Sequence, residues 1–224
     1  MTKFLFIAFS WGICVLIFSI FSYLDIYVSS LFYSSNGFYV TDFLSGVSEF
    51  LFICPMIAFS LLSLSFLMSN SGNYKNALKL SLSCMMIYVF CCLFVSHLGL
   101  KAVFHRPRPE NILQFGGNMH FTKAFQMKGE CLNRKKCSFV STHAMTGYAF
   151  SLISAFYYNA RRLRKRVIIA SFIIGTASGI TRIILGKHFL SDVVTSALIA
   201  YTATFMFTTF IDKKFIKHLV INEV

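Results

Sequence analysis

Six long stretches that are almost free of charged side chains constrain this sequence more than any other feature. They cover residues 4–24, 50–69, 80–100, 141–159, 167–185 and 189–211. Each is about 20 residues long, the length that an α-helix needs to cross the hydrocarbon core of a bilayer. The 224-residue chain is 56% hydrophobic with a mean hydropathy of +0.68, which excludes an ordinary soluble domain. We therefore predict an all-α, multi-pass membrane protein, a bundle of six transmembrane helices that forms a single domain over residues 1–224.

The distribution of basic residues predicts how this bundle lies in the membrane. Six crossings put both termini on one side, together with the Arg161–Arg166 cluster and the lysines near the C-terminus. Because short loops rich in Lys and Arg stay in the cytoplasm, we predict that this side is cytoplasmic. On the opposite side, ten of the 21 Lys and Arg residues fall in two segments, 101–136 and 182–187. Basic residues held there indicate an anionic ligand, and we expect phosphate or lipid headgroups rather than nucleic acid.

The start of the sixth stretch carries the first candidate site. His188 and Asp192 stand four residues apart, so they share one face of a helix. A carboxylate there can accept one ring N–H of the imidazole and leave the other nitrogen as a base or a nucleophile. Arg182, slightly earlier in the chain, has the planar geometry that suits a phosphate or a carboxylate. Taken alone, the same residues also fit a helix start with an interfacial histidine and a capping aspartate.

Two further clusters are predicted on the same membrane face. Lys101 and Arg108 follow the third stretch, where Pro107 and Pro109 favour an extended backbone that holds the cations in fixed directions. The segment 141–143, Ser-Thr-His, opens the fourth stretch. A hydroxyl can cap the helix there, and the first N–H groups of the helix favour an anion.

Together these clusters resemble the signature of a known family. In chain order they read Lys101-x6-Arg108-Pro109, Ser141-Thr142-His143 and Thr181-Arg182-x5-His188-x3-Asp192. This order and spacing are similar to the motifs K-x6-R-P, P-S-G-H and S-R-x5-H-x3-D of the type 2 phosphatidic acid phosphatase family. The sequence departs from the family pattern at Val140 and Thr142, which stand in place of Pro and Gly, and at Thr181, which stands in place of Ser.

The resemblance implies a phosphatase mechanism. His188 would attack phosphorus and form a phosphohistidine, Asp192 would orient its ring, and His143 would protonate the leaving oxygen and later activate water. The phosphate oxygens are expected to contact Lys101, Arg108, Arg182, Ser141 and Thr142. We expect no metal and no other cofactor, because the three cations take the place of a magnesium clamp. The sequence also lacks a cluster of carboxylates for a divalent ion.

Several residues near the motifs have more than one interpretation. His105, Arg106 and Lys187 could contact the headgroup of the substrate, and Lys187 could equally be an interfacial anchor. Cys131 and Cys137 lie in the same outside loop and could form a disulfide in an oxidising periplasm.

The likeness extends, on fewer residues, to the bacterial lipid A phosphatase branch of the family. The matching segments are Leu24-Asp25-Ile26 and Cys131…Cys137-Ser138-Phe139-Val140. They imply a lipid A phosphomonoester as the substrate of an inner-membrane enzyme whose active site faces the periplasm and whose termini are both cytoplasmic. Undecaprenyl diphosphate and phosphatidylglycerophosphate are alternative substrates. A membrane protein that only binds phosphate or lipid is the alternative outside enzymes, although a binder has no use for two histidines. The altered second motif also leaves open the interpretation that the protein is an inactive relative of the family.

Overall fold

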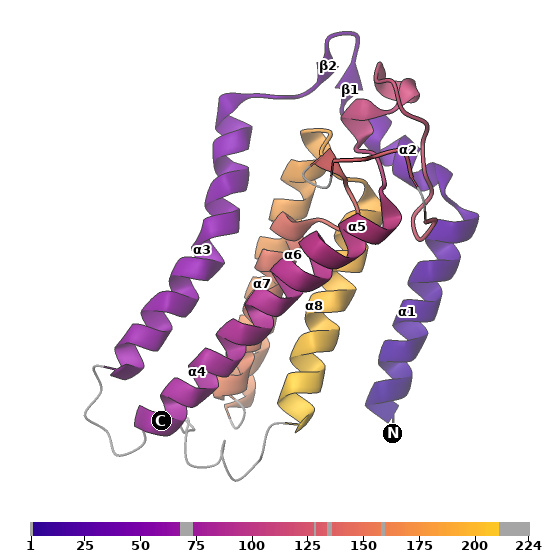
Figure 1. Cartoon of the computed structure of the whole chain (residues 1–224). Coiled ribbons are helices and arrows are strands. Elements are labelled where there is room, and N and C mark those ends of the chain that lie inside the picture. Colours follow the sequence, from indigo (N-terminus) through magenta and orange to yellow (C-terminus); the bar gives the residue numbers. More distant parts are fainter. Residues whose placement is uncertain (1, 68–73, 128, 134–135, 158–159, 211–224) are drawn as a thin grey trace.

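The computed structural model describes residues 2–67, 74–127, 129–133, 136–157 and 160–210 (Figure 1). Its long helices run side by side, and the short elements gather at one end of the bundle. The segment α4–η1–α5 is one unbroken rod, in which η1 is a π-helix. In chain order the elements are α1 (Thr2–Ile20), α2 (Tyr23–Ser30), β1 (Tyr33–Ser34), β2 (Gly37–Phe38), α3 (Asp42–Leu67), α4 (Tyr74–Val89), η1 (Phe90–Leu100), α5 (Lys101–Phe104), η2 (Pro109–Asn111), η3 (Leu113–Phe115), α6 (Thr142–Ala149), η5 (Phe150–Tyr157), α7 (Arg161–Ile184) and α8 (Leu190–Phe210).

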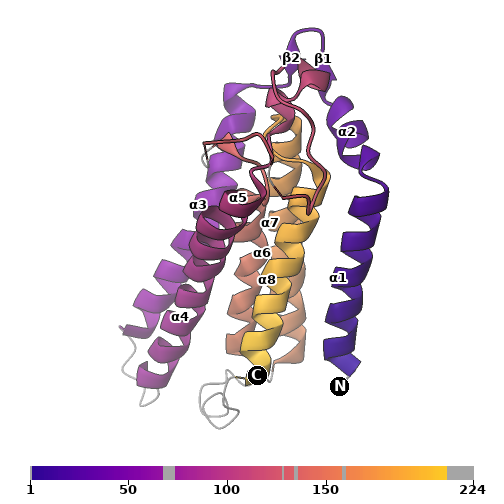
Figure 2. The ribbon, with the colours of Figure 1, turned by 45° about the vertical axis from the view of Figure 1, so that its right-hand side comes forward.

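The centre of the bundle is formed by α6, α7 and α8. The helix α6 packs against α7, α8 and α3, while α3 with α4 and α1 flank this centre on opposite sides (Figures 1 and 2). The closest approach joins α6 to α7, where a Cβ on Gly147 would lie 2.6 Å from the Cα of Gly175. Small residues at such a crossing let two backbones approach closely, as is common between helices in membranes.

Polar side chains inside the bundle bond from helix to helix. The hydroxyls of Ser151 and Thr204 lie 2.7 Å apart and join η5 to α8. On the flank, Trp11 Nε1 donates to Thr202 Oγ1 at 3.0 Å and joins α1 to α8. Such hydrogen bonds satisfy polar groups that cannot bond to water inside a bilayer.

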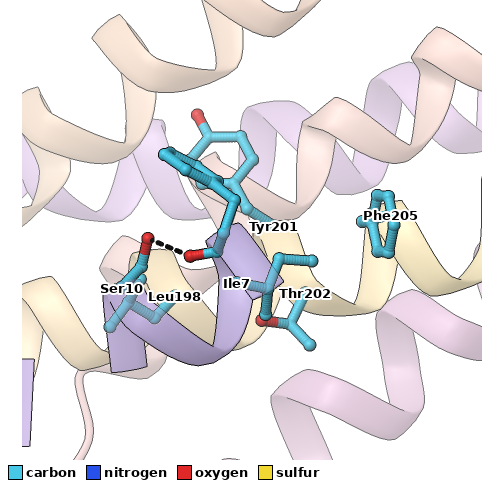
Figure 3. Close-up of a pocket in the computed structure, with 7 residues that line it drawn as sticks. Ile7, Ser10, Leu198, Tyr201, Thr202 and Phe205 are labelled. Carbon is cyan, nitrogen blue, oxygen red and sulfur yellow. Dashed lines mark hydrogen bonds between the residues drawn. The ribbon is translucent and has the colours of Figure 1, made fainter. Parts of the chain in front are cut away.

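The outer faces of the bundle are apolar. Phe6, Phe9 and Phe50 are 70, 68 and 67% exposed, an arrangement that suits lipid rather than water. In Figure 3, Ser10 turns its hydroxyl to the carbonyl of Phe6 at 2.9 Å, so its polar group is satisfied within α1. This serine belongs to an apolar groove between α1 and α8, whose other labelled residues are Ile7, Leu198, Tyr201, Thr202 and Phe205.

The multi-pass helical fold is confirmed, and the count of six spans is approximate. Helices long and apolar enough to cross a membrane are Asp42–Leu62, Leu78–Asn111, Arg161–Ile184 and Leu190–Phe210. A fifth results if Phe4–Ile20 and Tyr23–Ser30, which meet at a bend of 76°, are one span. The fourth predicted stretch forms α6 and η5, which have eight residues each within the part of the chain that the structure describes.

Several helix bounds differ from the predicted stretches. The first helix ends at Ile20, and the chain then turns sharply into α2. The helix α3 begins at Asp42, well before the predicted start at residue 50, so Pro55 lies inside it and not in its first turn. The helix α7 begins at Arg161, which makes the basic cluster helical. A hydrophobic run marks the part of a helix that suits the membrane, whereas its ends are set by local turns and caps.

One end of the bundle carries a small aromatic cap. The rings of Tyr33, Phe38 and Phe115 lie 5.0–5.2 Å from one another and hold the β1–β2 hairpin against η3. Phe189, the residue after His188, belongs to the same cluster. The start of α1 and the start of α7 lie at the opposite end (Figure 1). The loops that carry the sequence motifs therefore meet at the end with the hairpin.

Candidate active site

The site is centred on the link between α7 and α8. Gly186 takes a positive φ of 66° there, which lets the chain reverse from one helix into the next. His188 follows, 1% exposed, with its Nδ1 3.4 Å from Oδ2 of Asp192 in the first turn of α8. The same carboxylate oxygen accepts the backbone N–H of Phe189 at 2.8 Å. Asp192 thus caps its own helix and faces one ring nitrogen of His188, which leaves Nε2 as the nitrogen for chemistry.

His188 lies in a strongly positive environment. Burial lowers the pKa of His188 well below its ordinary value of 6.5, and the charges of Lys101, Arg182 and Arg108 lower the pKa further. The ring is therefore neutral near pH 7 and its lone pair is available to attack an electrophile. Because these charges act on His188, the structure also brings the predicted cations of the first and third motifs around one histidine.

Each of the three cations reaches the site from a different element. Lys101 begins α5, the last turn of the long α4–η1–α5 rod, and is only 6% exposed. Arg182 comes from the last turn of α7; its Nη1 lies 3.4 Å from Ser48 Oγ, and its Nε is buried without a hydrogen-bond partner. Arg108 lies on an extended backbone before η2, as the two prolines predict. Buried positive charge of this density favours an anion such as phosphate.

His143 enters from the start of α6. Its Nε2 lies 3.2 Å from Oε1 of Glu49 on α3, and its ring packs on Phe52 with the centroids 4.5 Å apart. Glu49 is 58% exposed and His143 is 18% exposed, so this pair lies at the mouth of the site. Neither Glu49 nor Phe52 was predicted as a site residue from the sequence, although their spacing of three residues puts both on one helix face.

The hydroxyls of Ser141 and Thr142 have protein partners. Ser141 is the N-cap of α6 and accepts the backbone N–H of Ala144 at 3.4 Å. Thr142 Oγ1 lies 2.7 Å from Ser96 Oγ of the π-helix η1. The predicted cap is confirmed. That both hydroxyls also bind phosphate stays a prediction, because a hydroxyl with one hydrogen bond can still make another. The N–H groups in the first turn of α6 would add to an anion site there.

Of the three predicted headgroup contacts, the one assigned to Arg106 is wrong. Arg106 is 1% exposed and bonded inside the protein to Asp192 and Asp25 at 2.7 and 2.8 Å. The left-handed conformation of His105 ends α5 and turns the following residue inward, while His105 Nδ1 itself lies 2.8 Å from the carbonyl of Cys131. Lys187 pairs with Glu110, which also contacts Arg108 at 3.6 Å.

The predicted disulfide is present in the structure. Cys131 and Cys137 are bonded, with their Cα atoms 5.6 Å apart. The neighbouring residues 134 and 135, and the C-terminal lysines at 213, 214 and 217, lie outside the described residues. The backbone N–H of Cys131 donates to the carbonyl of His105 at 2.9 Å. The disulfide and this hydrogen bond together connect the end of α5 to the segment that leads into α6.

Comparisons with known proteins agree with this arrangement. Residues 77–216 match the family model described as the PAP2 superfamily. The chain is 30% identical over 201 residues to the lipid A 4′-phosphatase of Francisella tularensis subsp. novicida (strain U112), covering 84% of this chain and 86% of the relative. It is 32% identical over 140 residues to the lipid A 4′-phosphatase of Rhizobium leguminosarum, covering 61% of this chain and 58% of the relative. The crystal structure of a transmembrane PAP2 type phosphatidylglycerolphosphate phosphatase from Bacillus subtilis has the same fold, with a TM-score of 0.58, 18% identity and coverage of 95% of this chain and 96% of that one.

Proposed function

This chain belongs to the PAP2 superfamily, and from that premise we propose that it removes the 4′-phosphate of lipid A through a phosphohistidine on His188. It is a multi-pass membrane lipid phosphatase. The observation that carries the finer proposal is the buried, neutral His188 with a carboxylate on one ring nitrogen and three cations around it. A site that only binds phosphate needs the cations, whereas it has no use for the oriented imidazole.

In the first step, the Nε2 lone pair of His188 attacks phosphorus and the bond from phosphorus to the lipid oxygen breaks. The proton on Nδ1 stays with the ring and faces Asp192, whose charge stabilises the imidazolium that develops. The present distance of 3.4 Å is long for this bond, as is common before substrate binds. His143 enters this step as an imidazolium, a form that the negative charge of the bound phosphate favours, and donates its proton to the leaving lipid oxygen. Lys101, Arg108 and Arg182 hold the other phosphate oxygens.

In the second step, water replaces the histidine on phosphorus. His143, which lost its proton in the first step, takes a proton from the attacking water, and the bond between Nε2 and phosphorus breaks. Inorganic phosphate leaves, and both histidines return to their starting protonation states. The cycle therefore balances without an added reactant.

The proposed reaction uses no metal. Three positive side chains supply the charge that a divalent ion supplies in other phosphoryl transfers. In the parts of the chain that the structure describes, no group of three or more His, Cys, Asp or Glu residues is arranged to hold an ion. The purified protein should keep full activity in excess chelator.

We further propose that the site faces the periplasm of the bacterial inner membrane, with both termini in the cytoplasm. The basic residues at the start of α7 support this orientation, because they lie at the opposite end of the bundle from the site. A disulfide at the site end also suits an oxidising compartment.

The test is a substrate panel with purified protein in detergent or nanodiscs. Lipid A, undecaprenyl diphosphate and phosphatidylglycerophosphate are compared by release of inorganic phosphate, and the position of loss on lipid A is read by mass spectrometry. We expect loss of the 4′-phosphate, and His188→Ala should be inactive on all three. Turnover of undecaprenyl diphosphate or phosphatidylglycerophosphate alone would replace lipid A as the proposed substrate.

A further inference from the structure

A buried group of charges adjoins the catalytic histidine through Asp192. Asp25 comes from α2, Arg106 from the loop after α5, and Ser191 and Asp192 from the first turn of α8. None of the four is more than 1% exposed. Charges so far from water persist only when they are paired and fully bonded.

The bonds in this group are short and connect all four residues. Asp25 accepts the backbone N–H and the hydroxyl of Ser191 at 2.8 and 2.6 Å. The guanidinium of Arg106 donates from Nη2 to Asp25 at 2.8 Å and from Nη1 to Oδ1 of Asp192 at 2.7 Å. Its Nε donates to the carbonyl of Thr122 at 2.9 Å, so Arg106 cannot turn without breaking several bonds at once.

We propose that Asp25 and Arg106 are positioning residues for the phosphatase reaction, which hold Asp192, and through it His188, in the reactive arrangement. This inference rests on the proposed role of His188 as the nucleophile. Arg106 donates to Oδ1 of Asp192. The other oxygen, Oδ2, accepts the backbone N–H of Phe189 and faces Nδ1 of His188. The guanidinium also lies 4.2 Å over the ring of Phe189, the neighbour of His188 in the chain.

Charge gives Asp25 a second part in the reaction. When His188 bonds to phosphorus its ring becomes positive, and Asp192 must still carry a negative charge to stabilise it. Arg106 alone would cancel that charge, because its guanidinium is bonded to Asp192 and both side chains are buried. Asp25 balances Arg106, so the three groups together keep one net negative charge for the histidine. Asp25 thus influences the chemistry although it does not touch His188.

Asp25 lies outside the part of the chain that the family model matches. The family model matches residues 77–216, which include Arg106 but not α2. The α1–α2 segment therefore contributes a buried carboxylate to a site whose motifs all come later in the chain. A purely structural ion pair would tie α2 to α8 in the same way, and the experiment below separates the two roles.

The experiment measures the rate at which the full chain forms covalent phosphate from an aryl phosphate, by rapid mixing and alkaline quench. Asp25→Asn keeps the size of the side chain and removes its charge. We expect the rate to fall roughly 10–100-fold, as is typical when a residue that orients a catalytic group is changed. KM should change little, because the phosphate-binding cations are untouched. Asp42→Asn, the same change at an exposed carboxylate at the start of α3, is the control and should match the wild type.

The double variant Asp25→Asn/Arg106→Gln distinguishes charge from packing. It removes the two opposite charges together and leaves Asp192 with its own charge, so its rate should exceed that of Asp25→Asn. A structural role predicts the reverse, because the double variant loses more bonds. If Asp25→Asn does not fold, the folded double variant is compared with the wild type, and a rate equal to the wild type would overturn the proposal.

The pH dependence of kcat/KM in Asp25→Asn gives an independent test. The carboxylate of Asp192 faces His188 directly. The other charged or titratable groups around it are Lys101, Arg108, Arg182, His143 and, through its bond to Asp192, Arg106. Loss of the negative charge of Asp25 makes protonation of His188 harder, so the acid limb of kcat/KM should stay in place or move to lower pH. A looser, wetter site would move this limb to higher pH, and that result would contradict the proposal.

The same assay includes His188→Ala. Covalent phosphate in that variant would overturn the nucleophile itself, whatever Asp25 does. An inert His188→Ala together with a wild-type rate in Asp25→Asn would overturn only the present inference.

Discussion

His143→Ala separates the acid from the nucleophile and gives the most informative single substitution. General acid catalysis contributes roughly 10²–10⁴-fold, which is about 2.7–5.5 kcal/mol of barrier, when the leaving group is a poor one. A sugar alkoxide of lipid A is a poor leaving group, whereas the nitrophenolate of an aryl phosphate leaves without a proton. The variant should therefore lose by that factor the rate of the first step, the transfer of phosphate from lipid A to His188, and keep the rate of this transfer from the aryl phosphate within about tenfold of the wild type.

The structure indicates that this loss will not come from unfolding. The partner of His143 is Glu49, which is 58% exposed, so the variant leaves no buried charge behind. Half-exposed ion pairs stabilise a protein by about 0–1 kcal/mol, and the lost contact with Phe52 adds about 0.5–1.5 kcal/mol. Both are below the expected rise in the barrier.

The assay measures the first step alone, as the rate at which covalent phosphate forms after rapid mixing, with purified lipid A and with 4-nitrophenyl phosphate on the same preparation of protein. Folded protein is quantified by monodisperse elution and thermal unfolding. An equal loss of this rate on the two substrates would refute the role of His143 as the acid, and so would a wild-type rate on lipid A.

Other parts of the structure lead to three further predictions. The pKa of His188 is lowered well below 6.5, so its neutral form persists in mild acid and kcat/KM for the aryl phosphate should not fall between pH 7.5 and 6. The values of kcat/KM are corrected for ionisation of the substrate, measured by ³¹P NMR, and a fall with a midpoint near pH 6.5 would contradict this prediction. Gly147→Ala should lower the free energy of unfolding by roughly 1–3 kcal/mol in a thermal shift assay, because its Cβ meets the backbone of α7 at 2.6 Å, whereas Gly12→Ala, in open space on α1, should cause no loss. Single cysteines introduced on a Cys-free background at Lys123 and Arg164 should be labelled from the periplasm and from the cytoplasm respectively; labelling from one side only would refute the proposed orientation.

The sequence predicted the membrane fold and the main site residues because both depend on patterns that are local or fixed in spacing. Runs of about 20 apolar residues identify helices in a bilayer whatever their partners are. The four-residue step from His188 to Asp192 was predicted to place both side chains on one helix face; His188 precedes α8 by two residues, and the step still brings its Nδ1 to the carboxylate of Asp192. The motif cations could be placed together because alternate loops between membrane helices return to the same face.

The remaining site residues depend on contacts between distant segments. Glu49 meets His143 only because α3 packs against α6, and no spacing in the sequence reveals that pair. Arg106 lies between two motif residues and was expected as a possible contact of the substrate headgroup, but the left-handed turn at His105 directs it inward. Asp25 is 166 residues from Ser191, and only the 76° bend after α1 brings it there.

The central claim is that phosphate is transferred to His188, and direct identification of the phosphorylated residue tests it best. The full chain, with His143 changed to Ala so that hydrolysis of the intermediate is slow, is mixed with the aryl phosphate and quenched in alkali, where phosphohistidine is stable. Peptide mass spectrometry should then find one acid-labile phosphate on His188, and the His143→Ala/His188→Ala protein should carry none. Phosphate on any other residue, or label that persists after His188 is replaced, would contradict the account.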